Sequence, residues 1–174
     1  MVRGFRFDGG SLWLDFAATL GRAYSDNPQE RLHKPADLDA WLREAGLHAP
    51  AATWEDLTLA RDLRAAFRCV SEALVADATP SPVSLSRLAR WASPGAVAIE
   101  DAGARFTTIQ GALGALTLSA LMTANSPERH HLRQCQDADC AWVFLDPTGR
   151  RHWCSTRCGN RSRVRAHRAR QQAT

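Results

Sequence analysis

Four cysteines lie close together in the last quarter of the chain, and their spacing is suited to binding a metal ion. They form two pairs, Cys135 with Cys140 and Cys154 with Cys158, and thirteen residues separate the pairs. A structural zinc ion takes four thiolate or imidazole ligands in a tetrahedron, and short loops between paired ligands let both sulfurs reach one ion. The spacing therefore predicts a structural Zn²⁺ site formed by these four cysteines.

Other interpretations of the cysteines remain open from the residues alone. A redox pair fits poorly, because the separations differ from the Cys-x-x-Cys redox pattern. Four thiolates could also hold an iron–sulfur cluster. Three histidines could replace a cysteine ligand, although we expect them at the surface or in contact with phosphate: His130, His131 and His152. A fifth cysteine, Cys69, interrupts an amphipathic helical pattern, and we expect it to be a small buried core residue.

The residues around the cysteines indicate which elements position them. Residues 142–145 favour a β-strand, residues 146–149 favour a turn, and residues 150–153 are expected to return as a second strand. Cys158 then opens an expected helix, whose unpaired N–H groups and dipole stabilise a thiolate. A small core over the metal is expected from Trp142, Phe144 and Trp153. A knuckle, a hairpin and a ligand in the first turn of a helix follow the order of a treble-clef zinc finger.

The expected helix after Cys158 is strongly basic. Residues 147–174 contain eight arginines and no acidic residue, whereas residues 1–146 contain 14 basic and 18 acidic side chains. This asymmetry indicates a polyanionic partner, with DNA favoured over RNA. If five phosphates of duplex DNA are neutralised, log K falls with log salt at a slope of about −4.5. Six residues are expected to contact the nucleic acid: Arg161, Arg163, Arg165, His167, Arg168 and Arg170.

The preceding residues are expected to form a mainly α-helical domain with a small β-hairpin. The clearest helical pattern spans about residues 54–76, where Thr53 and Asp56 form a capping-box pattern. Residues 22–34 are expected to form a loop, and alternation on either side of residues 101–104 predicts the hairpin. Three arginines of the long helix are expected to face solvent: Arg61, Arg64 and Arg68.

Aromatic residues of the helical domain allow two interpretations. They could line a pocket for an unidentified small-molecule effector, or they could simply fill the core. The candidate residues are Trp13, Phe16 and Trp41, joined by Trp54. Homodimerisation is a further role considered for this domain. Asp15, His33 and Glu44 are polar groups that an enzyme could use, but they show no catalytic spacing, so we expect no enzyme.

Length and composition limit the class of protein. A chain of 174 residues suits one domain with a small appendage, and the shift in composition near residue 133 divides it into residues 1–133 and 134–174. No run of 18 apolar residues is present, and the first ten residues do not resemble a secretory signal. We therefore expect a cytoplasmic protein with no membrane partner, and a reducing cytosol favours metal ligation over disulfides.

The C-terminal motif resembles the CGNR zinc-finger family. The resemblance rests on three stretches: Cys140-Ala-Trp-Val-Phe-Leu-Asp146, Arg151-His-Trp-Cys-Ser155 and Cys158-Gly-Asn-Arg161. Many members have four residues between the last two cysteines, whereas this chain has three. The body resembles the ABATE domain, the usual N-terminal partner of this zinc finger, through residues 12–16 with Thr19 and residues 41–47.

The resemblance implies a Zn²⁺-binding transcription regulator of the stress-induced class, whose zinc finger binds DNA. Two other functions fit the same residues. An adaptor would use the zinc finger only as a structural clip and bind an acidic protein surface through the basic helix. An RNA-binding protein would use the same helix on a different polyanion.

Overall fold

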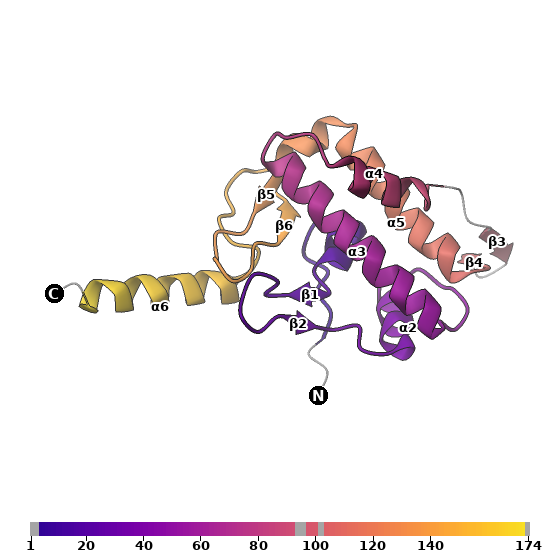
Figure 1. Cartoon of the computed structure of the whole chain (residues 1–174), viewed down its shortest axis with the longest axis horizontal. Coiled ribbons are helices and arrows are strands. Elements are labelled where there is room, and N and C mark those ends of the chain that lie inside the picture. Colours follow the sequence, from indigo (N-terminus) through magenta and orange to yellow (C-terminus); the bar gives the residue numbers. More distant parts are fainter. Residues whose placement is uncertain (1–3, 93–96, 101–102, 173–174) are drawn as a thin grey trace.

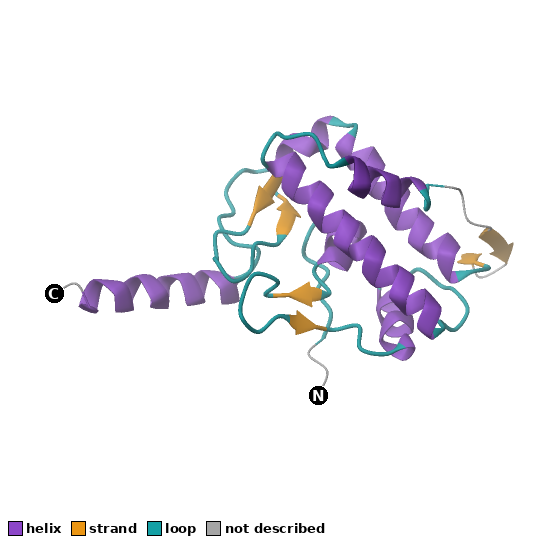
Figure 2. Ribbon diagram, viewed as in Figure 1, coloured by secondary structure: helices purple, strands orange, loops and turns teal. Residues whose placement is uncertain are grey.

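A computed structural model describes residues 4–92, 97–100 and 103–172 of the chain. Within these residues six α-helices carry most of the fold, and three two-stranded antiparallel sheets join them (Figures 1 and 2). The expected fold, mainly α-helical with a small β-hairpin and a basic helix at the end, is confirmed.

Helix α3 (Trp54–Val75) lies at the centre of the helical body. It begins at the predicted capping box: Thr53 Oγ1 accepts a hydrogen bond from the Asp56 N–H (3.1 Å), and the Thr53 N–H donates to the Asp56 carboxylate (2.9 Å). This reciprocal pair satisfies backbone groups that the first turn leaves unpaired. Four helices pack against α3: α1 (Leu12–Ala17), α2 (Pro35–Glu44), α4 (Pro82–Ala89) and α5 (Ile109–Ala124).

The core of the body is aromatic. Trp13 and Phe16 of α1, Trp41 of α2 and Phe67 of α3 are fully buried. The ring centroids of Phe16 and Trp41 are 4.8 Å apart, and those of Trp13 and Phe67 are 5.8 Å apart, with both pairs in edge-on geometry. Each such side chain contributes about 3–5 kcal/mol relative to alanine. Three of the four residues considered for an effector pocket, Trp13, Phe16 and Trp41, are therefore core residues.

Three expectations for α3 were wrong. Arg64 is buried, and its guanidinium lies 2.6 Å from the Glu30 carboxylate, because a short hairpin covers that face of the helix. Cys69 is exposed instead of buried, and the side chain of Trp54 is 66% exposed. Spacing along one helix identifies its apolar face, but it does not show which neighbours cover the remaining faces.

The hairpin that covers Arg64 overlaps residues 22–34, which were expected to form a loop: one strand precedes this segment and the other lies inside it. Strand β1 (Leu20–Gly21) pairs with strand β2 (Gln29–Glu30), with Leu20 opposite Glu30. The connecting loop begins at Arg22, whose φ of 51° is left-handed. The predicted hairpin of the body is confirmed, since β3 (Val97–Glu100) pairs with β4 (Gly103–Phe106).

The strand pairing of the cysteine-rich region differs from the prediction. After the 3₁₀ helix η1 (Pro127–His131), β5 (Leu132–Gln134) pairs with β6 (Val143–Leu145), and residues 150–153 form no strand. Leu132 and Val143 belong to the main hydrophobic core of the body. The strand that pairs with β6 is therefore β5, which precedes the first cysteine pair, because β5 packs against α3. Helix α6 (Thr156–Gln172) then extends away from the body (Figure 1).

Candidate metal centre and basic helix

The β5–β6 hairpin and the start of α6 bring the four cysteines together. Cys135 follows β5 directly, and its N–H donates to the Trp142 carbonyl oxygen (2.9 Å), which closes the knuckle that contains Cys140. Cys158 lies in the first turn of α6, as predicted. The Gln136 N–H donates to the His152 carbonyl oxygen (3.0 Å) and so holds the loop that leads to the second pair beside the knuckle.

The sulfur atoms have the arrangement that a single metal ion requires. All four are buried, and their ligand atoms lie within 4.8 Å of one another. The Cys154 and Cys158 sulfurs are 3.4 Å apart, and those of Cys140 and Cys154 are 3.6 Å apart. A tetrahedron with Zn–S bonds of about 2.3 Å has sulfur–sulfur edges of about 3.8 Å. A disulfide needs about 2.05 Å, so the geometry fits a metal ion and not a disulfide.

Mutual contact between the thiols changes their acidity. Hydrogen bonding with Cys140 lowers the pKa of Cys135 to about 7, and hydrogen bonding with Cys135 lowers the pKa of Cys158 to about 7. Cys135 acts to raise the pKa of Cys154, but Cys140 and Cys158 together lower it to about 7. Hydrogen bonding with Cys135, and to a smaller extent with Cys154 and Cys158, raises the pKa of Cys140 well above its ordinary value. A divalent cation would replace the remaining thiol protons, because metals bind the thiolate form.

Two guanidinium groups offset the charge of this sulfur cluster. Arg6 Nη1 donates to the Cys154 sulfur (3.4 Å), and Arg161 Nη2 donates to the Cys158 sulfur (3.2 Å). Four thiolates and one divalent cation carry a net charge of −2, which two arginines would balance. Arg6 also lies 4.2 Å from the centroid of the Trp142 ring and donates to the Cys154 carbonyl oxygen (3.1 Å). The N-terminal segment is thereby attached to the metal centre.

A small aromatic core covers the cysteines, as predicted. Trp142 and Phe144 are buried in this cluster, and Trp153 packs against it. The Trp142 indole N–H donates to the Leu14 carbonyl oxygen (2.9 Å) and so connects the cluster to α1. A Cβ atom on Gly159 would lie 3.2 Å from the Trp153 ring, so the glycine allows α6 to approach the indole.

Two acidic residues of the knuckle fix the direction of α6. The Asp137 side chain is fully buried, and its carboxylate accepts from Arg161 Nε (2.7 Å) and Arg165 Nη1 (3.3 Å). Asp139 accepts from Arg165 Nη2 (2.9 Å). These arginines lower the pKa of Asp137, although burial acts in the opposite direction. Two of the six residues expected to contact nucleic acid are therefore already paired within the protein.

Comparison with family models agrees with this architecture. The model of the ABATE family, described as a putative stress-induced transcription regulator, matches residues 10–126. The chain belongs to the ABATE family. The model of the CGNR zinc finger matches residues 131–171, so the resemblance that the sequence predicted is confirmed. No curated protein matches this ABATE chain.

The CGNR match and the sulfur geometry agree on the role of the cysteines. The four buried side chains are positioned to bind a metal ion, and the family name implies zinc. The histidines considered as substitutes are outside this four-residue cluster. In the described parts of the ABATE chain, no helix combines the length and apolar character that a membrane span requires.

The remaining residues of α6 that were expected to contact nucleic acid lie on the exposed surface of the helix. Arg163, His167, Arg168 and Arg170 are exposed. Arg163 donates to the Asn160 side-chain oxygen (2.6 Å), and its guanidinium lies 5.7 Å from the centroid of a Trp153 ring. The nucleic-acid contacts of these four residues stay a prediction.

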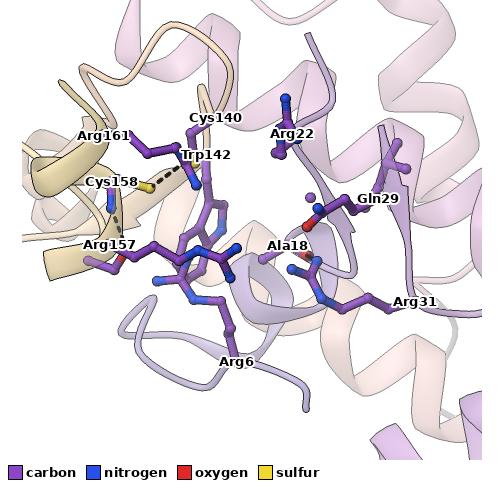
Figure 3. Close-up of a pocket in the computed structure, with 13 residues that line it drawn as sticks. Arg6, Ala18, Arg22, Gln29, Arg31, Cys140, Trp142, Arg157, Cys158 and Arg161 are labelled. Atoms are coloured by element: carbon purple, nitrogen blue, oxygen red, sulfur yellow. Dashed lines mark hydrogen bonds between the residues drawn. The ribbon is translucent and has the colours of Figure 1, made fainter. Parts of the chain in front are cut away.

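Sequence reasoning did not find the arginine-lined cavity beside the metal centre (Figure 3). It lies between the β1–β2 hairpin and the start of α6, and it has a volume of about 170 Å³. Its arginines come from three distant parts of the chain, so no local motif marks them. The β1–β2 hairpin that carries Arg22 and Arg31 was also not predicted, because its two-residue strands are too brief to show a periodic pattern.

Proposed function

We propose that this ABATE protein is a Zn²⁺-dependent, DNA-binding transcription regulator that acts by binding and not by catalysis. The observation that carries the proposal is the exposure of α6, which extends from the body while its first turn is held by the metal centre (Figure 1). Of the residues of this helix, only Cys158 and Gly159 are buried.

The length and charge of α6 support an anionic partner. A helix of 17 residues is about 25 Å long, and an isolated helix of this length is only marginally stable in water. Repulsion between its arginines weakens it further, and contact with phosphates would remove that repulsion. The metal centre and the ion pairs of Asp137 with Arg161 and Arg165 would hold about the first three turns rigid, so the outer turns would be presented to DNA in a fixed direction.

The internal ion pairs change the expected number of phosphate contacts. Arg161 and Arg165 are engaged with Asp137 and Asp139, so fewer arginines than the sequence indicated remain for DNA. If Arg163, Arg168 and Arg170 each neutralise one phosphate, the slope of log K against log salt is about −2.7. The five phosphate contacts assumed in the sequence analysis correspond to a slope of about −4.5.

The test is a salt titration of the zinc-loaded protein with a labelled DNA duplex of mixed sequence. The test variant carries Arg163→Gln and Arg168→Gln. The matched control carries Arg43→Gln and Arg90→Gln, which remove the same charge from exposed positions on the body. We expect the test variant to flatten the slope by about 1.8 and the control to leave it unchanged.

Equal slopes for the two variants would remove α6 from the interface. Parallel titration with a single-stranded and a duplex RNA of the same sequence identifies the nucleic acid, because tighter binding to RNA at equal salt would assign the helix to RNA. An acidic protein that stays bound after nuclease treatment, with no measurable DNA affinity, would establish the adaptor role instead.

A further inference from the structure

The cavity beside the metal centre is lined by positively charged side chains. The lining contains five arginines and no aspartate or glutamate among its described residues. The arginines are Arg6, Arg22, Arg31, Arg157 and Arg161. Figure 3 shows the side chain of Arg31 pointing toward those of Arg6 and Arg157. Such a concentration of guanidinium groups around one cavity is suited to phosphate, which arginine binds through paired N–H donors.

The helical body and helix α6 each provide part of the cavity wall. Arg22 and Arg31 belong to the β1–β2 hairpin of the ABATE body, whereas Arg157 and Arg161 belong to α6. Arg6 comes from the segment before α1. A molecule held by these groups would therefore connect the body to the basic helix.

Arg31 is held in position before any ligand arrives. Its Nη1 donates to the Ala18 carbonyl oxygen at the end of α1 (2.8 Å). A Cβ atom on Gly21 would lie only 2.6 Å from this nitrogen, so a glycine is needed for the guanidinium to lie against the strand. Preorganised donors bind an anion more tightly, because less side-chain freedom is lost on binding.

Arg22 has a donor that none of the described residues uses. Its Nε is buried without a hydrogen-bond acceptor in the described part of the chain, and Nη2 is 3.6 Å from the Asp139 carboxylate. Its backbone also adopts the left-handed conformation, with φ at 51°, which is costly for a residue with a side chain. A buried donor without an acceptor is destabilising, and an anion in the adjoining cavity would provide one.

The charges around the cavity leave some of the arginines available for a ligand. Arg6 and Arg161 donate to metal-centre sulfurs, and each also pairs with an aspartate. Arg157 is exposed, and no carboxylate among the described residues pairs with it. Arg157 also lies in the first turn of α6, where the helix dipole favours negative charge. An anion would thus interact mainly with Arg22 and Arg157, beside the guanidinium of Arg31 that the Ala18 carbonyl oxygen positions.

We propose that this cavity binds a small phosphate monoester as an effector. A cavity of about 150 Å³ can hold a benzene molecule, so about 170 Å³ accommodates a phosphate group with a few attached carbons. The bound phosphate bridges the β1–β2 hairpin and α6 and thereby stabilises the orientation of the basic helix. This binding does not require that the protein binds DNA.

The test uses the zinc-loaded full chain without DNA, titrated calorimetrically with inorganic phosphate and with glycerol 3-phosphate at constant ionic strength. We expect saturable 1:1 binding, with glycerol 3-phosphate bound more tightly. Arg157→Gln should weaken binding by about tenfold or more, because a charge-assisted contact is lost. Gly21→Ala should weaken it as well without changing net charge, whereas Arg43→Gln, a distant exposed arginine, should have no effect.

Two results would overturn the proposal. One is the absence of saturable binding of either probe to the wild-type protein. In that case, flattening of the DNA salt slope by about 0.9 in Arg157→Gln would assign the cavity to a DNA backbone phosphate and not to a small molecule. The other is equal weakening by Arg43→Gln and Arg157→Gln, which would indicate only a general attraction to the basic surface.

Discussion

Replacing Asp137 with asparagine separates the ion pairs that hold α6 to the knuckle from the DNA contacts that we propose for this helix. The substitution keeps the size of the side chain and one acceptor oxygen but removes a buried negative charge. In the wild-type protein the carboxylate oxygens accept from Arg161 Nε at 2.7 Å and from Arg165 Nη1 at 3.3 Å. We expect Asp137→Asn to lower the stability of the fold and, at the same time, to strengthen the salt dependence of DNA binding.

The size of the stability loss follows from these contacts. A short charge-assisted hydrogen bond contributes about 1.5–3 kcal/mol. The contact with Arg165 contributes less, since that side chain is 48% exposed and solvent screens its charge. Asparagine retains part of the first contact, so the net loss should be about 2 kcal/mol. For a chain of this length the loss corresponds to a decrease in Tm of about 4–8 °C.

The effect on DNA binding has the opposite sign. Once released, Arg161 and Arg165 would each be able to neutralise a phosphate, so the slope should change from about −2.7 to about −4.5. Thermal unfolding and a salt titration of the zinc-loaded variant measure the two effects. Asp26→Asn removes the same charge from an exposed loop position and serves as the control. A variant with lowered Tm but an unchanged slope would refute the idea that these ion pairs withhold the arginines from DNA.

Three further predictions concern the metal centre and the core. Removing zinc with a chelator, or replacing Cys158 with serine, should unwind α6, because the metal centre holds its first turn. Circular dichroism would show this as a loss of helical signal. Retained helicity in the zinc-free protein would contradict a metal-anchored helix. Arg6→Gln should weaken zinc affinity by about 10–100-fold in a competition titration, whereas Arg43→Gln should not. Burial raises the pKa of Asp15 to about 6, so the cost of keeping its carboxylate ionised in the fold grows as the pH rises from about 4 and reaches its full size above about 6. Asp15→Asn should therefore increase the free energy of unfolding above pH 6 by up to about 3 kcal/mol, and the gain should shrink as the pH falls toward 4; equal stability at pH 8 would contradict it.

Much of the metal centre could be predicted from the sequence, because its determinants are local. Two cysteine pairs within 24 residues, with the last cysteine at the start of a helix, define the ligands before any tertiary contact is known. The capping box of α3 was predictable for the same reason. Both features depend on residues a few positions apart, where spacing and backbone geometry decide the outcome.

The partners of the arginines could not be predicted, because they depend on contacts between distant segments. Arg6 reaches a sulfur 148 positions away, and Arg64 pairs with Glu30 across a hairpin of two-residue strands. Asp137 lies in the loop between the first two cysteines, and nothing in the neighbouring sequence indicated a buried carboxylate that faces α6. A count of basic residues in the last 28 positions therefore overestimated the charge available to a partner.

The placement of Leu132 and Val143 in the main core limits how these proteins can be recombined. A C-terminal fragment cut before β5 would expose apolar side chains that normally contact α3, and it would also lose Arg6 and the Leu14 carbonyl that accepts from Trp142. Chimeras that exchange zinc fingers between relatives should consequently succeed only when the matching surface of the body is transferred with them. Within this architecture the two parts would be expected to diversify together over evolutionary time rather than as interchangeable cassettes.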